Sequence, residues 1–110
     1  MNDQNDITPM VIDLGANRRG EINESWLAQF GGAIKMILKR MFGGDFMPVK
    51  VRGNAREVSS FANALQKEKN YIKALNSYGL NDPKTYRSKS TLKNAVSKFE
   101  RGTGIKWPFK

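Results

Sequence analysis

Apolar residues recur at helical spacing between residues 23 and 44. Apolar positions three and four apart line one face of an α-helix, and this face is broad. Its members are Trp26, Leu27, Phe30, Ile34, Ile37, Leu38 and Met41, with Ala33 and Phe42 beside them. Asn23 or Ser25 can cap the start by accepting backbone N–H bonds, and Gly43-Gly44 favour its end. The pattern predicts an amphipathic helix over this stretch.

The apolar stripe of this helix is wider than a small neighbouring unit easily covers, which leaves three interpretations open. The helix closes over the rest of the chain as core, or it packs against another protein, as exposed apolar stripes of this size usually do. In the third interpretation it lies on a membrane surface, because Lys35, Lys39 and Arg40 flank the stripe. Gly31 and Gly32 inside the helix indicate a kink or the close approach of another backbone.

A second pattern begins at residue 46. Met47, Val49 and Val51 alternate with other residues, which predicts a short strand with one buried face. Pro48 has no backbone N–H to donate to a neighbouring strand. The strand is therefore at the edge of a sheet, or Pro48 is its first residue.

A long helix is expected next. Asn54 is a good N-cap, and Glu57 three residues later completes a capping-box arrangement. One face of this helix is apolar, and Gly79 ends it. That face consists of Val58, Phe61, Ala62, Leu65, Ile72 and Leu75.

The chain then restarts as a helix at Asp82, an N-cap, with Pro83 at the first helical position. We expect one turn through 85–86, after which Ser88 or Ser90 caps a separate final helix. Leu92, Ala95, Val96 and Phe99 form the apolar face of that helix. The pattern predicts a helical hairpin.

Gly102 and Gly104 break the last helix. Three apolar residues then alternate with Lys106 and Pro108, which predicts a closing strand. They are Ile105, Trp107 and Phe109. The expected fold is therefore a small α+β domain, a β-α-α-β unit whose two-stranded sheet is covered by the helical hairpin. Helical cover is needed because a two-stranded sheet is unstable alone.

The first 22 residues differ from both patterns. Polar and turn-forming residues punctuate them, around a short apolar patch from Met10 to Leu14. We interpret 1–22 as an extended N-terminal arm that is mobile, or that docks as a strand through this patch. The chain thus divides into an arm, the amphipathic helix 23–44 and a compact domain, 46–110.

Charge is distributed unevenly between these regions. Residues 46–110 carry fourteen Lys and Arg against four carboxylates, a net +10, whereas residues 1–45 carry five against six, a net −1. The sum is the +9 of the whole chain. A compact basic unit is typical of proteins that bind a polyanion, most often nucleic acid.

Few residues for catalysis are present. The chain has no His and no Cys, which removes disulfides, thiolate metal sites and the usual general bases together. Its ten carboxylates form no recognisable metal-binding or paired arrangement. We therefore predict no catalytic residues, no metal site, no cofactor and no small-molecule substrate. The acidic, polar start is unlike a signal peptide, and no apolar run approaches the roughly 20 residues that span a bilayer.

The basic residues of the two predicted hairpin helices are the candidate DNA contacts. They point away from the apolar faces and could merge into one patch over the connecting segment. These residues are Lys67, Lys69, Lys73, Lys84, Arg87, Lys89, Lys93 and Arg101, with Tyr86 as a candidate base-stacking ring. Six phosphate contacts would give a log–log salt slope near −5. The competing interpretation is an ordinary solvated helix surface, and no sequence-reading motif is evident.

Two short runs resemble known proteins. The run Tyr78-Gly79-Leu80-Asn81-Asp82-Pro83-Lys84-Thr85-Tyr86 and the ending Thr103-Gly104-Ile105-Lys106-Trp107-Pro108-Phe109 are similar to small proteins of tailed bacteriophages. Some of these are encoded among recombination and replication genes. The resemblance covers roughly 49–110 and implies a viral setting, in the host cytoplasm or the virion.

The sequence therefore predicts a non-enzymatic phage accessory protein that binds DNA, or a DNA-containing assembly, through its phosphate backbone. The alternative is a minor virion structural protein whose arm and amphipathic helix dock onto other capsid or tail proteins. A third hypothesis is an adaptor that occupies an acidic surface of a host protein. Protein contacts are expected at Met10, Val11, Ile12, Leu14, Trp26, Leu27, Phe30, Ile34, Ile37 and Met41.

Overall fold

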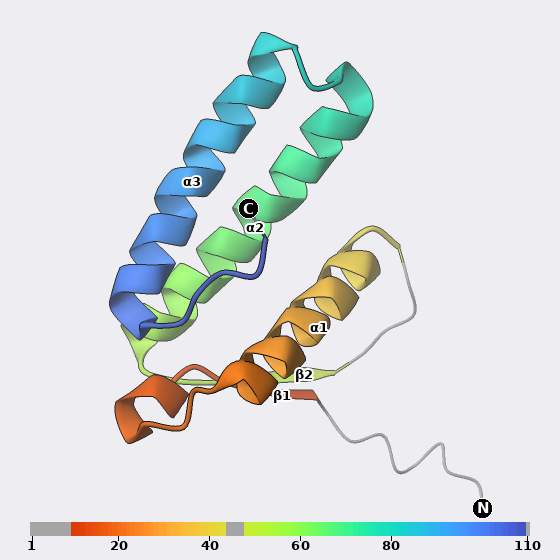
Figure 1. The fold of residues 1–110 in the computed structure, drawn as a ribbon. Coiled ribbons are helices and arrows are strands. Elements are labelled where there is room, and N and C mark those ends of the chain that lie inside the picture. Colours follow the sequence, from red (N-terminus) through yellow and green to blue (C-terminus); the bar gives the residue numbers. More distant parts are fainter. Residues whose placement is uncertain (1–9, 44–47, 110) are drawn as a thin grey trace, which may run out of the picture.

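A computed structural model describes residues 10–43 and 48–109. Two strands and three long helices make a small α+β fold, the class that the sequence predicts (Figure 1). The elements are β1 (Met10–Asp13), the 3-10 helix η2 (Ala16–Arg19), α1 (Glu24–Met41), β2 (Val49–Arg52), α2 (Ala55–Tyr78) and α3 (Pro83–Thr103).

The sheet pairs β1 with β2 in parallel, with Met10 opposite Val49 and Asp13 opposite Arg52. Parallel neighbours need a crossover connection, and α1 lies in that connection. A two-stranded sheet and a helical hairpin are thus confirmed, but one strand is not where we expected it. Residues 105–109 follow the hairpin in the predicted order and form no strand.

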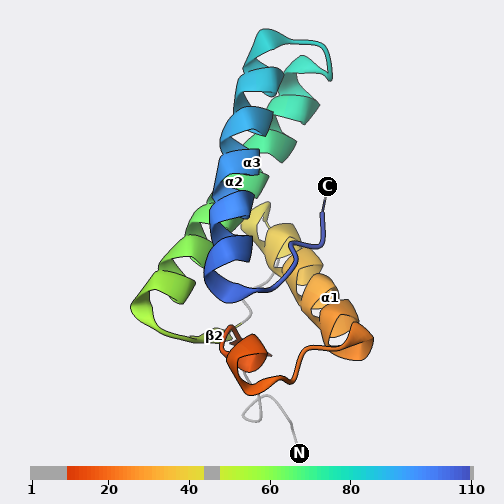
Figure 2. The same cartoon turned by 60° about the vertical axis from the view of Figure 1, so that its left-hand side comes forward.

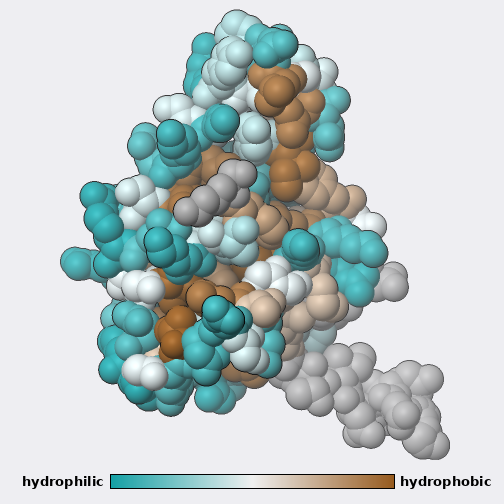
Figure 3. All heavy atoms as spheres, viewed as in Figure 1, coloured by the Kyte–Doolittle hydropathy of each residue, from teal (hydrophilic) through white to brown (hydrophobic). Residues whose placement is uncertain are grey.

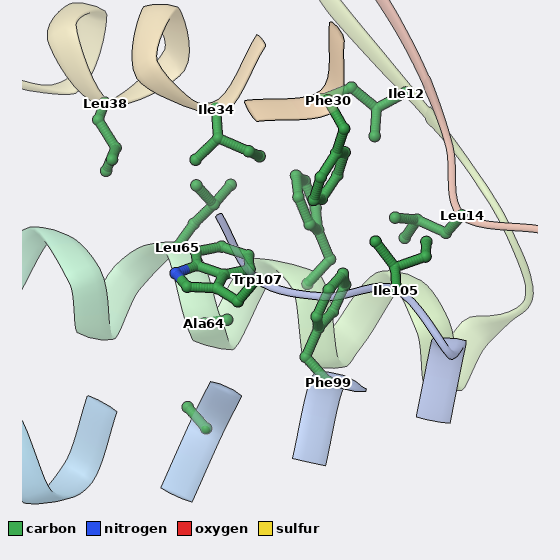
Figure 4. Packing of buried hydrophobic residues seen from close by; sticks show 12 residues of the cluster. Ile12, Leu14, Phe30, Ile34, Leu38, Ala64, Leu65, Phe99, Ile105 and Trp107 are labelled. Carbon is green, nitrogen blue, oxygen red and sulfur yellow. The ribbon is translucent and has the colours of Figure 1, made fainter. Parts of the chain in front are cut away.

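Side chains explain why the C-terminal segment does not pair. The Ile105 N–H donates to Thr103 Oγ1 at 3.1 Å, and the Trp107 N–H donates to Glu100 Oε2 at 2.8 Å. These donors are therefore unavailable to a ladder. The segment instead buries Ile105 and Trp107 between the hairpin and α1 (Figure 4).

The amphipathic helix is confirmed as α1. Asn23 caps it by accepting the Trp26 N–H at 2.8 Å. Its apolar stripe is part of the core, because Phe30 and Ile34 are buried against the hairpin. Gly31 faces the C-terminal segment, where a Cβ would lie 3.4 Å from Pro108 Cβ. The first of the three interpretations of this helix is therefore the one observed.

The hairpin begins and ends largely as predicted. The Asn54–Glu57 capping box starts α2, and Gly79 follows its last residue. Asp82 caps α3 by accepting the Lys84 N–H at 2.8 Å. The expected interruption near Ser88 is wrong, since α3 runs without a break to Thr103.

Continuity of α3 follows from its buried face. Thr85, Leu92 and Phe99 are seven residues apart, close to two helical turns, so they lie on the same side of one uninterrupted helix. Gly104 then ends α3 in the left-handed conformation at φ +72°, where L side chains are strained.

The core lies at one end of the hairpin. Figures 1 and 2 show α1 and the C-terminal segment covering the base of α2 and α3, while the distal half of the hairpin projects beyond them. Four rings fill the centre. They are Phe30, Phe61, Phe99 and Trp107, with centroids 5.3–6.5 Å apart.

From residue 10 to residue 22, the N-terminal region does not form the extended arm that the sequence predicts. β1 pairs in the sheet, and Ile12, Leu14 and Ala16 are buried in the core. The alternative of a docking strand from Met10 to Leu14 is closer to the observed structure, with docking inside the same chain. Residues 1–9 of the predicted arm lie outside the described residues.

Most of the predicted protein-contact residues are used inside the molecule. Ile12, Leu14, Phe30 and Ile34 are buried, and Met10, Trp26, Leu27, Ile37 and Met41 are half-buried. Only Val11 of that set is exposed. Because most of these predicted contact residues pack inside the molecule, few of them are exposed enough to contact a partner protein. None of the helices within 10–43 and 48–109 has the length and apolar character that crossing a bilayer requires.

Candidate nucleic-acid interface

The four carboxylates of the basic region all have structural roles. Glu57 is buried and accepts hydrogen bonds from Arg18 Nε at 3.1 Å, Arg18 Nη2 at 3.0 Å and the Asn54 N–H at 2.9 Å. The Arg18 guanidinium lowers the pKa of Glu57 most, burial opposes this, and the Asn54 N–H adds to the lowering. Glu57 is therefore anionic and neutralised by Arg18 of η2.

Two further carboxylates hold the C-terminal segment. The Trp107 indole Nε1–H donates to Glu68 Oε1 at 2.9 Å, and the Trp107 backbone N–H donates to Glu100. Glu68 is buried at this contact. Asp82 is the N-cap of α3. All four carboxylates are thus bonded to backbone, indole or Arg18.

The basic residues of the same region lack such partners. Within the two described ranges, ion pairs form only at Arg18 and Arg19, both in η2. No Lys or Arg from 48 to 109 has a carboxylate within ion-pair distance there. Within the described residues, the positive charge of the hairpin is therefore not neutralised by ion pairs.

A groove between the two helices collects part of this charge. It lies where the start of α2 meets the end of α3, and its cationic members are Arg56, Lys98 and Arg101. Ser59, Ser60, Asn63 and Gly102 complete the lining. The lining contains three cations, three neutral hydrogen-bonding side chains and no carboxylate. This is a suitable donor set for phosphate oxygens.

Helical periodicity extends the same face towards the hairpin tip. On α3, Arg87 and Lys84 are 11 and 14 residues before Lys98, close to three and four full turns. On α2, Lys67 follows groove residue Asn63 by four positions. We call the resulting surface the cationic face. Its members are Arg56, Lys67, Lys84, Arg87, Lys98 and Arg101.

The cationic face is long and accessible. Five of its six members are exposed and Lys67 is half-buried. The first and last α3 members are 17 positions apart, or about 26 Å along the helix axis. DNA carries one phosphate per strand in each 3.4 Å of duplex. The face is therefore about seven to eight base pairs long.

The predicted contact residues are divided by the fold. Lys67, Lys84, Arg87 and Arg101 belong to the cationic face, whereas Lys89 and Lys93 line a cavity beside the C-terminal segment. Lys69 Nζ lies 5.9 Å from the Phe42 ring centroid near the end of α1, and Lys73 is exposed on α2 about 120° around the helix from Lys67. Tyr86 is exposed near the hairpin tip. The single merged patch that the sequence suggests is therefore not observed, because only Lys67, Lys84, Arg87 and Arg101 share the cationic face.

Arg56 and Lys98 are the members that the prediction left out. The signal for Lys98 was present as the repeat of Lys84, Arg87, Lys98 and Arg101 on one side of a helix. The predicted break in α3 concealed this repeat, because residues of two separate helices do not share one helical periodicity.

The cavity beside the C-terminal segment has mixed chemistry. Lys89 and Lys93 line it together with Glu68 and Glu100, over an apolar floor that includes Phe109. Two carboxylates beside two lysines leave this cavity without the excess charge of the cationic face. Neither in this cavity nor elsewhere in the described ranges do acidic side chains form a group of three that could hold a metal ion.

Comparisons with family models, with curated proteins and with solved structures find no match to this chain. The resemblance to phage proteins and its viral setting therefore stay predictions.

Proposed function

We propose that the protein binds DNA non-enzymatically, by holding the phosphate backbone against the cationic face. The observation that carries the proposal is the groove lined by Arg56, Lys98 and Arg101 without a carboxylate. Acidic residues are the usual neutralisers of such a surface. Here the three Glu side chains of the basic region are bonded to Arg18 or Trp107, and Asp82 caps α3.

The mode of binding follows from the residue types. Lys and Arg neutralise phosphates and release condensed counterions, which gives affinity without sequence information. Ser and Asn side chains of the groove add hydrogen bonds to phosphate oxygens. Six contacts predict a slope of log K against log salt near −5 on duplex DNA.

A salt titration of fluorescence anisotropy with labelled DNA tests the proposal. The key variant is Arg56→Gln/Lys98→Gln/Arg101→Gln, which removes half of the cationic face. Because each lost phosphate contact reduces the slope by about one, we expect its magnitude to fall by about three. The substitutions are on the surface, so each should change the free energy of unfolding by less than about 0.5 kcal/mol.

The chain offers a matched control. Lys73→Gln/Lys89→Gln/Lys93→Gln removes the same charge, also one residue from α2 and two from α3, but away from the cationic face. We expect this variant to retain most of the salt dependence. Equal loss in both variants would mean that net charge alone binds DNA, and affinity indifferent to salt would remove the proposal.

The alternative of a virion structural protein has less support in the fold. Burial of Phe30 and Ile34 gives the apolar stripe of α1 a role within the chain, so a partner is not needed to cover it. Stoichiometric copies of the chain in purified particles, measured by mass spectrometry, would favour this alternative instead.

A further inference from the structure

The tip of the hairpin exposes large apolar side chains. Tyr78 is 49% exposed, Leu80 60% and Tyr86 55%. They lie within nine residues of one another, in the part of the hairpin that projects beyond α1 (Figures 1 and 2). Hydrophobic residues also reach the surface over the distal hairpin in Figure 3. This concentration is at the end farthest from the core.

The tip is held by specific hydrogen bonds. The Thr85 hydroxyl donates to Gly79 O at 2.6 Å and also lies 3.3 Å from Ala74 O, which ties the start of α3 to the end of α2. The Tyr86 hydroxyl donates to Asn81 Oδ1 at 3.4 Å. The rings are therefore presented on an ordered turn.

The tip is continuous with the cationic face. Lys84 belongs to that face, and its Nζ lies 4.5 Å from the Tyr78 ring centroid. Arg87 follows one turn later on α3. A phosphate held by Lys84 would place the attached nucleotide beside the exposed Tyr78 ring.

We propose that the hairpin tip stacks an unpaired base, so that the protein prefers single-stranded DNA to duplex. The inference rests on the proposed function and specifies its substrate. Aromatic rings stack on bases regardless of sequence, but only where the base is not enclosed in a duplex. Lys84 lies over the Tyr78 ring and Arg87 follows Tyr86 in the chain. These cations match a phosphate chain, which favours DNA over an apolar protein partner for this surface.

Anisotropy titrations with an oligothymidylate strand and with a duplex of equal length test the preference. We expect tighter binding to the strand, together with a shallower salt slope, since single strands release about 0.7 counterions per contact and duplexes about 0.9. The Tyr78→Ala variant should weaken binding to the strand roughly 5- to 150-fold and leave duplex binding nearly unchanged.

Two controls separate stacking from other effects. Tyr78→Phe keeps the ring and should bind the strand like the unmodified protein. Met36→Ala truncates another exposed apolar side chain, on α1, and should not change affinity. Circular dichroism of each variant checks that the hairpin stays folded.

The outcomes distinguish the two proposals. If Tyr78→Ala and Tyr86→Ala both bind the strand as tightly as the unmodified protein, while steep salt dependence persists, the stacking inference is wrong and backbone binding stands. If neither strand nor duplex binds with salt dependence, both proposals are wrong.

Discussion

The two sides of the α2–α3 hairpin differ although the same helices form both. The side facing α1 packs Phe61 and Phe99 with Phe30 and Trp107 into an aromatic cluster. The cationic face on the other side carries six Lys and Arg and a groove without acids. The difference shows that position within a helical repeat, more than composition, assigns a residue to stability or to binding.

Carboxylates explain how the two sides stay distinct. Glu68 and Glu100 are directed towards the C-terminal segment, where they bind Trp107, and Glu57 is directed towards η2. Each stabilises the core side and is absent from the groove lining. Substitutions on the core side should therefore change stability and leave the salt slope of DNA binding unchanged.

The largest effect is expected at the centre of the core side. Trp107 is 1% exposed and contacts the rings of Phe61 and Phe99. Trp107→Ala should lower the free energy of unfolding by about 3–5 kcal/mol, because it removes buried area and leaves a cavity. Urea denaturation followed by circular dichroism measures the change.

Trp107→Phe serves as the companion variant. It keeps an aromatic ring and loses the indole Nε1–H, so its cost should be clearly smaller than that of Trp107→Ala. Similar stability of the unmodified protein and the alanine variant would mean that the C-terminal segment does not pack as described.

A smaller effect is expected at Glu68. Glu68→Ala leaves the buried Trp107 Nε1–H without its acceptor, which should cost about 1–3 kcal/mol. Glu68→Gln keeps a carbonyl acceptor and should cost less. Equal losses in the two variants, again by urea denaturation, would assign the effect to packing and not to this hydrogen bond.

The smallest effect concerns acid stability through Glu57. Its pKa in the folded state is below the ordinary value of 4.5, mainly because of Arg18. The stabilisation of the folded state by the Arg18–Glu57 pair is therefore fully present above about pH 4.5. It is lost as the pH falls through the folded-state pKa of Glu57. Arg18→Gln should be less stable than the unmodified protein at neutral pH, with the difference shrinking below pH 4.5.

Arg19→Gln is the matched control, because Arg19 pairs with Asp13 and Glu21 and not with Glu57. The pKa of Asp13 is also lowered: burial opposes the lowering, while the Gly15 N–H and Arg19 produce it. The pH dependence of the stability of Arg19→Gln should therefore reflect the titration of Asp13 and not that of Glu57. A stability difference for Arg18→Gln that does not change with pH would contradict the assignment to Glu57.

Sequence alone was sufficient where the determining contacts are local. Asn23, the Asn54–Glu57 box and Asp82 begin their helices as expected, because each cap bonds to a backbone N–H two or three residues away. The apolar repeat of α1 and the excess of Lys and Arg are likewise properties of the chain itself.

Tertiary structure decided what depends on distant residues. Only the fold shows that β1 pairs with β2, since an alternating apolar pattern does not identify its partner, and 105–109 showed that pattern equally well. The continuity of α3 depends on contacts with α2, such as that of Thr85 with Ala74. The side of the hairpin on which each lysine lies follows from that continuity and from where α1 packs.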